Sequence, residues 1–190
     1  MLSWQMKRAV LEGLYAQVRD LLEPDKTRTG MAETPVRVAK AWQEWVGGYE
    51  IDPTVLLKCF DDGAENYDEM VFVRNIPFYS HCEHHMAPFF GKATVGYIPN
   101  KRIVGISKLA RVVDAYARRF QVQERMTVQI ADVIQDVLDP IGVGVHLRAE
   151  HMCMASRGVK LSDTDTVTTK FYGAIKDQPM ARAEFLGLVK

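Results

Sequence analysis

Residues 70–98 read MVFVRNIPFYSHCEHHMAPFFGKATVGYI, and the architecture can be worked out from this stretch. Met70 to Tyr79 and Lys92 to Ile98 are rich in Val, Phe and Ile, which predicts two β-strands. A histidine-rich segment joins them. Arg102 to Ile106 has a similar composition and follows a turn at Pro99-Asn100, so a third strand is expected there.

Two helical patterns and further strands follow. Ser107 is expected to cap the first helix and Asp139-Pro140 to end the second. Residues 143–150 alternate between apolar and polar side chains, as a strand does, and Thr166 to Ile175 can supply one more. Strands, two helices and strands in this order predict an α+β fold, an antiparallel sheet with two long helices on one face.

Two more helices are expected before the sheet. Apolar residues recur at helical spacing from Val10 to Leu22, and Pro24 follows where a helix commonly stops. Thr34 and Pro35 are typical of an N-cap and a first helical residue, and Gly47-Gly48 is typical of a stop. These patterns predict an N-terminal helical arm.

The composition argues against several classes of protein. The 190 residues carry 24 Lys+Arg and 24 Asp+Glu, so no overall charge favours nucleic acid or an anionic membrane. We recognise no signal peptide and no apolar run of membrane-spanning length. Three cysteines, an odd number, fit a reducing compartment. We therefore expect a cytoplasmic protein.

The histidines and cysteines are clustered in the sequence. Four of the five histidines, namely His81, His84, His85 and His151, lie within three residues of Cys82 or Cys153. Cys82 and His85 are spaced closely enough to bind one metal ion, and Cys153, on a distant strand, can complete the site. A set of thiolate and imidazole ligands selects zinc. Three ligands leave a fourth position for water, as in catalytic sites. A closed structural site with His84 or His151 as fourth ligand, or no metal at all, remains open.

Other polar residues are candidates for proton transfer and anion binding. His84 and His151 flank the metal ligands, and His151 and Cys153 are expected on one face of a strand. Lys108 and Arg111 share a face near a helix N-terminus, where phosphate is favoured, although solvated surface charges are the ordinary alternative. Glu124 either serves the dipole of its helix or accepts hydrogen bonds from a guanine base.

Several separate motifs resemble GTP cyclohydrolase I in order and spacing, over nearly the whole chain. The motifs are Glu33-Thr34-Pro35-Val36-Arg37-Val38-Ala39-Lys40, His81-Cys82-Glu83-His84-His85, Tyr97-Ile98-Pro99, Gly105-Ile106-Ser107-Lys108-Leu109 with Arg111, Val122-Gln123-Glu124-Arg125, and His151-Met152-Cys153 with Arg157-Gly158. The resemblance implies a tunnelling fold (T-fold) and a Zn²⁺ ion held by Cys82, His85 and Cys153.

The resemblance also implies a reaction and its residues. In the family, water activated by zinc adds to C8 of the guanine of GTP, C8 leaves as formate, and rearrangement gives 7,8-dihydroneopterin triphosphate. His84 matches the residue that protonates the ring nitrogen, and His151 and Ser107 match residues that assist later proton transfers. The substrate-binding matches are Gln123 and Glu124 for guanine, and Arg37, Lys108, Arg111 and Arg157 for the triphosphate.

The family assembles as rings, commonly two stacked pentamers, with each pocket between subunits, so the resemblance implies a homodecamer. We assign residues 1–68 to the N-terminal helical region and residues 69–190 to the T-fold catalytic region of a single functional domain. One departure is that Thr168-Thr169 is followed by Lys170 and a single Gly173, where the family tends to have Thr-Thr-Thr-Ser and Gly-Gly.

Three other functions are compatible with parts of the sequence. His81-Cys82-Glu83 fits the first half of a nucleoside deaminase signature, but no second cysteine follows Cys153 two residues on. A zinc module without enzymatic activity and a degenerate ring of the same fold are the remaining alternatives. Cys59 has no assigned role.

Overall fold

The computed structural model describes residues 2–60 and 67–189. It divides into two compact units, Met1–Gly47 and Gly48–Lys190. Among the helices of the described ranges, none has the length and apolar character needed to cross a membrane.

The first unit holds the two predicted N-terminal helices, α1 (Trp4–Leu22) and α2 (Thr34–Trp45), with the short 3₁₀ helix η1 (Thr29–Met31) between them. Both helices are confirmed, but the expected cap of α2 is off by one residue. Glu33 occupies the N-cap position and Thr34 is already helical, without a side-chain cap bond. The Trp42 indole donates a hydrogen bond to the Tyr15 hydroxyl, which ties α2 to α1.

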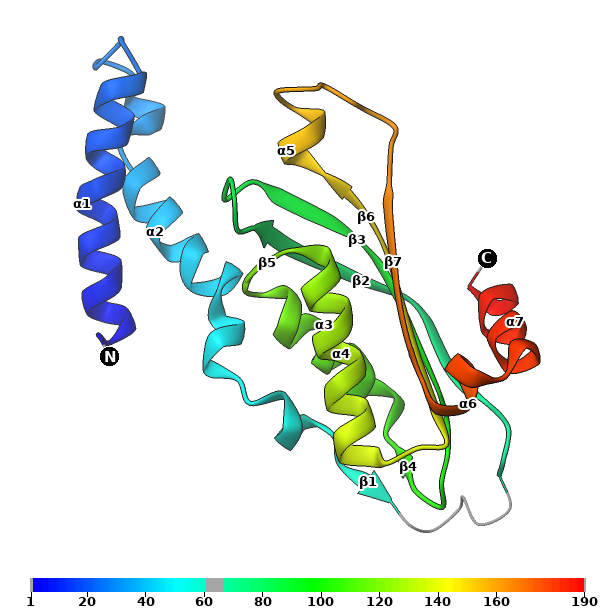
Figure 1. Cartoon of the computed structure of the whole chain (residues 1–190). Coiled ribbons are helices and arrows are strands. Elements are labelled where there is room, and N and C mark those ends of the chain that lie inside the picture. The colour runs from blue at the N-terminus through cyan, green and yellow to red at the C-terminus, as the bar shows by residue number, and fades with distance from the viewer. Residues whose placement is uncertain (1, 61–66, 190) are drawn as a thin grey trace. The chain divides into compact units, whose positions relative to one another are not determined.

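The second unit is a mixed α+β structure, as predicted (Figure 1). In chain order its elements are η2 (Gly47–Glu50), η3 (Pro53–Leu56), β1 (Cys59–Phe60), β2 (Val71–Cys82), β3 (Pro88–Ile98), β4 (Ile103–Val104), α3 (Ile106–Ala117), β5 (Phe120–Gln121), α4 (Gln123–Leu138), β6 (Gly142–His151), α5 (Met152–Ala155), β7 (Thr166–Tyr172), α6 (Gly173–Asp177) and α7 (Pro179–Leu188).

The main sheet has the strand order β5-β2-β3-β6-β7. Its pairs are antiparallel except β2 with β5, which run parallel. The strand expected at Arg102 to Ile106 is corrected: β4 holds two residues and pairs with β1 in a separate ribbon. The Tyr97 hydroxyl accepts a hydrogen bond from the Val104 amide at 3.1 Å, which anchors that ribbon to β3.

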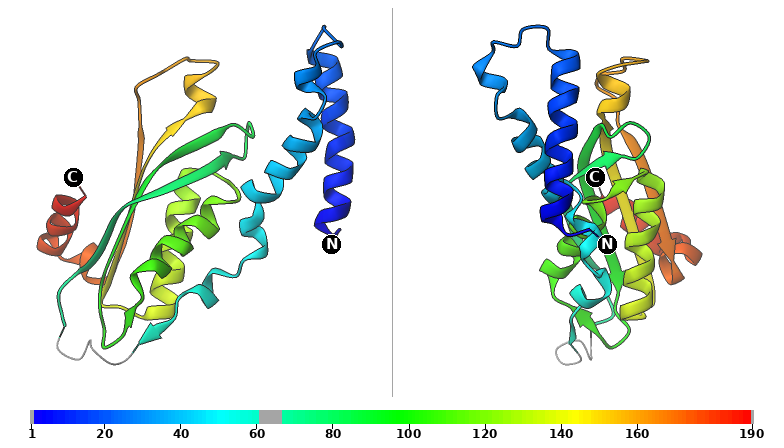
Figure 2. Two further views of the ribbon diagram at one scale, coloured as in Figure 1. Left: turned by 180° about the vertical axis from the view of Figure 1, so that it is seen from behind. Right: turned by 90° about the vertical axis from the view of Figure 1, so that its left-hand side faces the viewer.

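Helices α3 and α4 cover one face of the sheet (Figures 1 and 2). Inward positions of β6 alternate as predicted, and Val143, Val145, Leu147 and Ala149 are each at most 2% exposed. The expected cap of α3 is corrected, because the helix begins at Ile106 with Gly105 at its N-cap, so Ser107 lies within the first turn. Burial of both apolar stripes against the sheet forms the main core.

The opposite face carries α6 and α7, two helices that the sequence analysis did not predict (Figure 2). The last strand ends at Tyr172, short of the expected Ile175, and Gly173 adopts a φ of +52° that turns the chain into α6. Phe185 of α7 is fully buried, with its ring 5.2 Å from that of Phe72 and 5.4 Å from that of Phe171. A second, smaller core therefore closes this face.

Candidate metal centre

The first two candidate ligands sit where β2 turns into β3. Inward positions of β2 alternate from Ile76 through Phe78 and Ser80 to Cys82, which is the last inward residue of the strand and 7% exposed. The Cys82 amide donates to the Ala87 carbonyl at 2.8 Å and so closes the connection. This tight turn brings His85 back toward the end of its own strand.

The third candidate ligand, Cys153, lies just beyond the end of β6, about seventy residues further along the chain. Residue His151 of β6 is paired with Phe89 of β3, so the end of β6 lies beside the start of β3. The sequence analysis placed Cys153 on the same strand as His151. This is corrected: the strand ends at His151, and Cys153 lies in the short helix α5 that follows directly.

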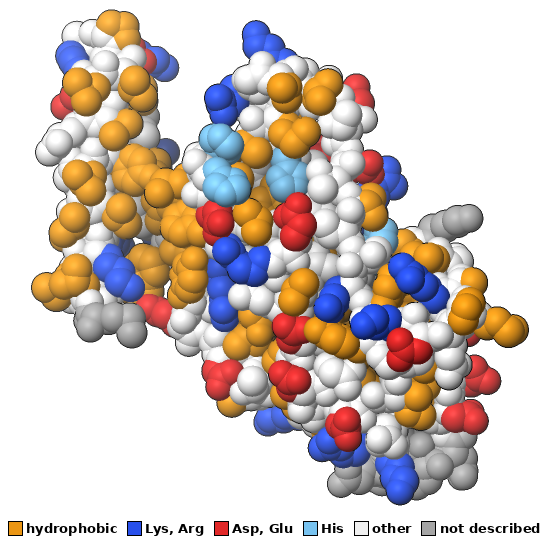
Figure 3. Space-filling model, viewed as in Figure 1, with side chains coloured by type: hydrophobic (Ala, Val, Ile, Leu, Met, Phe, Trp, Pro, Cys, Tyr) orange, Lys and Arg blue, Asp and Glu red, His pale blue; other side chains and the backbone are white. Residues whose placement is uncertain are grey.

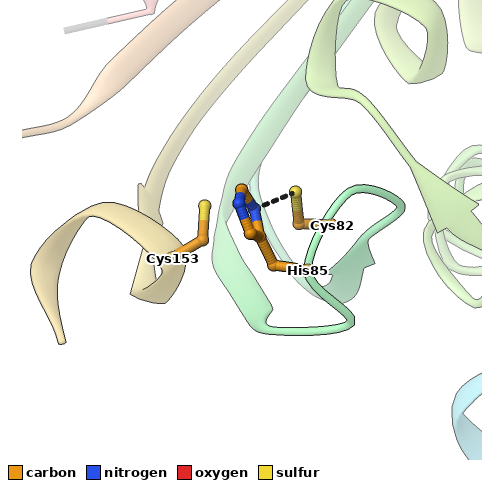
Figure 4. Close-up of side chains that lie close together, drawn as sticks. All are labelled: Cys82, His85 and Cys153. Atoms are coloured by element: carbon orange, nitrogen blue, oxygen red, sulfur yellow. Dashed lines mark hydrogen bonds between the residues drawn. The ribbon is translucent and has the colours of Figure 1, made fainter. Parts of the chain in front are cut away.

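The three side chains converge in space. The donor atoms of Cys82, His85 and Cys153 all lie within 4.8 Å of one another, and their side chains point toward a common centre (Figure 4). The Cys82 sulfur lies 3.7 Å from Nδ1 of His85. Two such ligands of one tetrahedral zinc ion would be separated by about 3.6 Å, given ordinary Zn–S and Zn–N bond lengths. The residues therefore fit a metal ion.

The electrostatics of the cysteines favour a cation. Burial raises the pKa of the Cys153 thiol, and the neighbouring Cys82 raises it further, since two adjacent thiolates would repel each other. A divalent cation would reverse both effects by stabilising the thiolates. The arrangement is thus suited to binding a metal rather than to presenting free thiolates.

His84 lies on the exposed side of this centre. Its side chain is 64% exposed, and its Nδ1 lies 3.9 Å from the Cys82 sulfur. The adjacent Glu83 forms an ion pair with Arg125 of α4, and the Arg125 guanidinium lowers the pKa of that carboxyl. In the space-filling view, histidine side chains gather on one face (Figure 3).

His151 is half-buried and held on two sides. Its Nε2 lies 2.8 Å from Oε1 of Gln123, and its ring stacks on Phe89 with centroids 4.6 Å apart and planes 2° from parallel. Burial lowers the pKa of His151, an effect that the Glu124 carboxylate partly offsets. The centre therefore combines three metal-ligand candidates with two imidazoles in different environments.

Comparisons with known proteins show the family of this chain. The model of the family described as GTP cyclohydrolase I matches residues 12–190. The chain belongs to the GTP cyclohydrolase I family. Among similar proteins, GTP cyclohydrolase 1 of Janthinobacterium sp. (strain Marseille) is 54% identical over 163 residues, which are 86% of this chain and 82% of the relative. GTP cyclohydrolase 1 of Nitrosospira multiformis is 53% identical over 169 residues, 89% of this chain and 88% of the relative.

A further relative, GTP cyclohydrolase 1 of Porphyromonas gingivalis, is 52% identical over 181 residues, 94% of this chain and 92% of the relative. Among solved structures, the apo form of the archaeosine synthase QueF-Like is similar at a TM-score of 0.45 and 17% identity, over 55% of this chain and 93% of that chain. The likeness to that structure is too distant to add to the family assignment.

In this GTP cyclohydrolase I family member, the proton-transfer candidate Ser107 and the anion-binding candidate Lys108 do not lie at the metal centre within one chain. Ser107 and Lys108 lie at the start of α3, whereas the residues that follow the end of α3 form β5, which pairs with Cys82. The twelve residues of α3 separate these two ends by about 18 Å. One chain therefore holds the candidate metal ligands and these two residues near opposite ends of a helix.

The other substrate-binding candidates are more dispersed. Arg111 is exposed on the second turn of α3, and Arg157 is exposed just after α5. Arg37 belongs to the first compact unit, where it pairs with Glu33 at 2.6 Å. Glu124 is exposed in the first turn of α4, next to the buried Gln123.

No local sequence pattern in this family member points to the residues that support His151. Phe89 was hidden among the apolar residues of a strand. Thr127 follows Gln123 by one helical turn, a spacing that places both on one face of α4. Thr168 had no local signal, because its contact with Gln123 depends on how β7 packs against α4.

Proposed function

We propose that this chain is a zinc-dependent GTP cyclohydrolase I, which opens the guanine imidazole ring of GTP, releases formate and forms 7,8-dihydroneopterin triphosphate. The observation that carries the proposal is the convergence of Cys82, His85 and Cys153 in a chain of this family. A zinc ion bound there would act as a Lewis acid that activates water near neutral pH.

Zinc is the metal that these donors favour. Thiolate and imidazole are soft ligands that suit zinc, whereas magnesium and calcium prefer oxygen. An open catalytic site is supported over a closed one, because the donor atoms that converge are those of Cys82, His85 and Cys153, and the side chain of His84 is largely exposed. Both histidines then remain available for proton transfer.

The chain's own residues provide proton transfer and base recognition. His84, exposed beside the ligands, is assigned as the general acid that protonates the ring nitrogen during ring opening. His151 and Ser107 are assigned to the later proton transfers. Glu124 would accept hydrogen bonds from N1–H and the amino group of guanine, and so discriminate against adenine, which has no donor at N1.

A ring-shaped assembly explains where the triphosphate would bind. Because Ser107 and Lys108 lie about 15 Å from the metal end of their own helix, we assign them to the site of a neighbouring copy. Two stacked pentamers of T-fold subunits, with residues 69–190 as the catalytic region, would build such sites between chains. Arg37, Arg111 and Arg157 would add positive charge around the triphosphate.

The location is also part of the proposal. Balanced charge and an odd number of cysteines support a cytoplasmic enzyme that binds neither nucleic acid nor membranes.

The decisive experiment incubates the purified protein with GTP, with and without a strong zinc chelator. Formate and the fluorescent pterin obtained after oxidation are measured together with bound zinc per chain. We expect both products from the zinc-loaded protein and neither after chelation. A folded, zinc-loaded protein that makes neither product would instead be a binding or degenerate ring.

Two cysteine variants sharpen this experiment. Cys153→Ala should lose both bound zinc and turnover, since a metal site with two protein ligands is weak. Cys59→Ala is the matched control, because Cys59 does not belong to the group of candidate ligands: it lies on β1, and its thiol donates to the Leu57 carbonyl at 3.6 Å. This variant should keep both zinc and turnover. Full activity in Cys153→Ala would refute the metal assignment, and an unchanged preference for GTP over ATP in Glu124→Gln would refute the role in base recognition.

A further inference from the structure

Gln123 is an unusual residue for direct contact with a substrate. It is the first residue of α4 and only 1% exposed, so its side chain is enclosed by the protein. A buried side-chain amide is costly unless its donors and its acceptor are satisfied. The partners of Gln123 therefore tell what the side chain does.

The nitrogen end of the amide faces acceptors. Nε2 of Gln123 lies 2.9 Å from the Thr166 carbonyl oxygen, 3.3 Å from the Leu147 carbonyl oxygen and 3.1 Å from Oγ1 of Thr168. Carbonyl oxygens only accept hydrogen bonds. If the amide were flipped, its oxygen would face two carbonyl oxygens, so only one orientation is compatible with the site.

Two hydroxyl groups hold this orientation. Thr127 donates to the backbone carbonyl of Gln123 at 2.7 Å, and its Oγ1 lies 2.7 Å from Oγ1 of Thr168. Since the Thr127 proton is used on that carbonyl, Thr168 must donate to Thr127, which leaves Oγ1 of Thr168 to accept from Gln123. The hydrogen bonds form a closed ring with one consistent direction.

The oxygen end of the amide then determines the tautomer of His151. Oε1 of Gln123 can only accept, and Nε2 of His151 lies 2.8 Å from it. The imidazole must therefore carry its proton on Nε2. In the neutral ring Nδ1 is then the basic nitrogen, and the stacked Phe89 ring restricts rotation of the imidazole.

We propose that Gln123 is a positioning residue, which holds His151 with Nε2 protonated and leaves Nδ1 to accept and return the proton in the later steps of the reaction. This role rests on the proposed function, because the proton transfers assigned to His151 are steps of that reaction. It replaces the direct guanine contact expected for the Gln123 side chain, so that Glu124 alone supplies side-chain recognition of the base.

The first test measures the tautomer without turnover. The zinc-loaded protein is labelled with ¹⁵N-histidine, and the His151 signals are assigned by their loss in His151→Ala. We expect protonated Nε2 and unprotonated Nδ1 in the wild type, and a mixture of tautomers in Gln123→Ala. Protonated Nδ1 in the wild type would overturn the proposal whether or not the protein turns over GTP.

The second test is a double-mutant cycle on turnover. Gln123→Ala should lower kcat about 10- to 100-fold with little change in KM, as removal of an orienting partner does. In the His151→Ala background the same substitution should have no further effect, because Gln123 acts only through His151. A residue in direct contact with guanine would instead raise KM in both backgrounds.

Three controls separate the possible failures. Bound zinc per chain should be unchanged in Gln123→Ala, which distinguishes loss of orientation from loss of the metal. Thr168→Val removes one hydroxyl of the ring without touching His151, and should lower kcat less than Gln123→Ala does. If the wild type makes no product, the proposed function fails, while the ¹⁵N signals still decide whether Gln123 sets the tautomer.

Discussion

The packing of α7 on the sheet yields a prediction that does not depend on the reaction. A methyl group at Gly144 of β6 would stand 2.6 Å and 2.7 Å from two ring carbons of Phe185. Such contacts are too short for carbon atoms, so Gly144→Ala should force the ring or the strand to move. Overpacking of this kind costs about 1–3 kcal/mol of unfolding free energy.

Removal of the ring has a larger but related effect. Phe185 is fully buried, so Phe185→Ala should lose about 3–5 kcal/mol through lost burial and the cavity left behind. That cavity is where the methyl group at position 144 would go. In the Phe185→Ala background, Gly144→Ala should therefore become neutral, or stabilising by up to about 1 kcal/mol as Gly-to-Ala changes in a strand can be.

The assay is urea unfolding followed by far-ultraviolet circular dichroism, at one protein concentration for all variants because association would contribute to stability. The matched control is Gly187→Ala. Gly187 lies on α7, as Phe185 does, and a methyl group added there meets nothing within 4 Å. This control should be neutral or slightly stabilising. An equal loss from Gly144→Ala with and without Phe185 would refute the packing of α7 described above.

Two further predictions concern polar contacts. The Tyr172 hydroxyl donates to Oδ1 of Asp132 at 2.5 Å, and this hydrogen bond raises the pKa of Tyr172 to about 12. The stabilisation that the bond provides should therefore be complete below about pH 10 and lost as the pH rises toward 12. Asp132→Asn should bring the pKa of Tyr172 back toward its ordinary value in an ultraviolet titration. Arg125→Ala should shift the midpoint of urea unfolding only slightly, because the Glu83–Arg125 pair is partly exposed, and a large drop in that midpoint would contradict this.

Much of the second unit follows from local patterns. The alternation in β6 was predicted because its inward residues repeat every second position, and α3 and α4 were predicted from their apolar stripes. The end of β6 was not, since nothing in the order of residues around His151 shows that the next residue turns into a helix. Cys153 was therefore correctly grouped with the other ligand candidates but assigned to the wrong element.

The features missed in the sequence depend on contacts between distant segments. The pairing of β5 with β2 involves two residues on each strand, too few to leave a pattern. Helix α7 has its one buried residue, Phe185, in a segment without a clear apolar stripe. Likewise, the resemblance assigned Gln123 to the substrate, and only the packing of α4 against β6 and β7 shows its amide turned inward.

The separation of the three candidate ligands along the chain has a consequence for how the protein is made. Cys82 ends β2 and His85 lies in the turn that follows, so they meet as soon as β2 and β3 pair, a local and rapid event. Cys153 reaches them only when β6, which lies about sixty residues beyond the turn, pairs with β3. A nascent chain thus offers two ligands early and the third late, and tight capture of the ion should mark completion of the sheet rather than nucleate it.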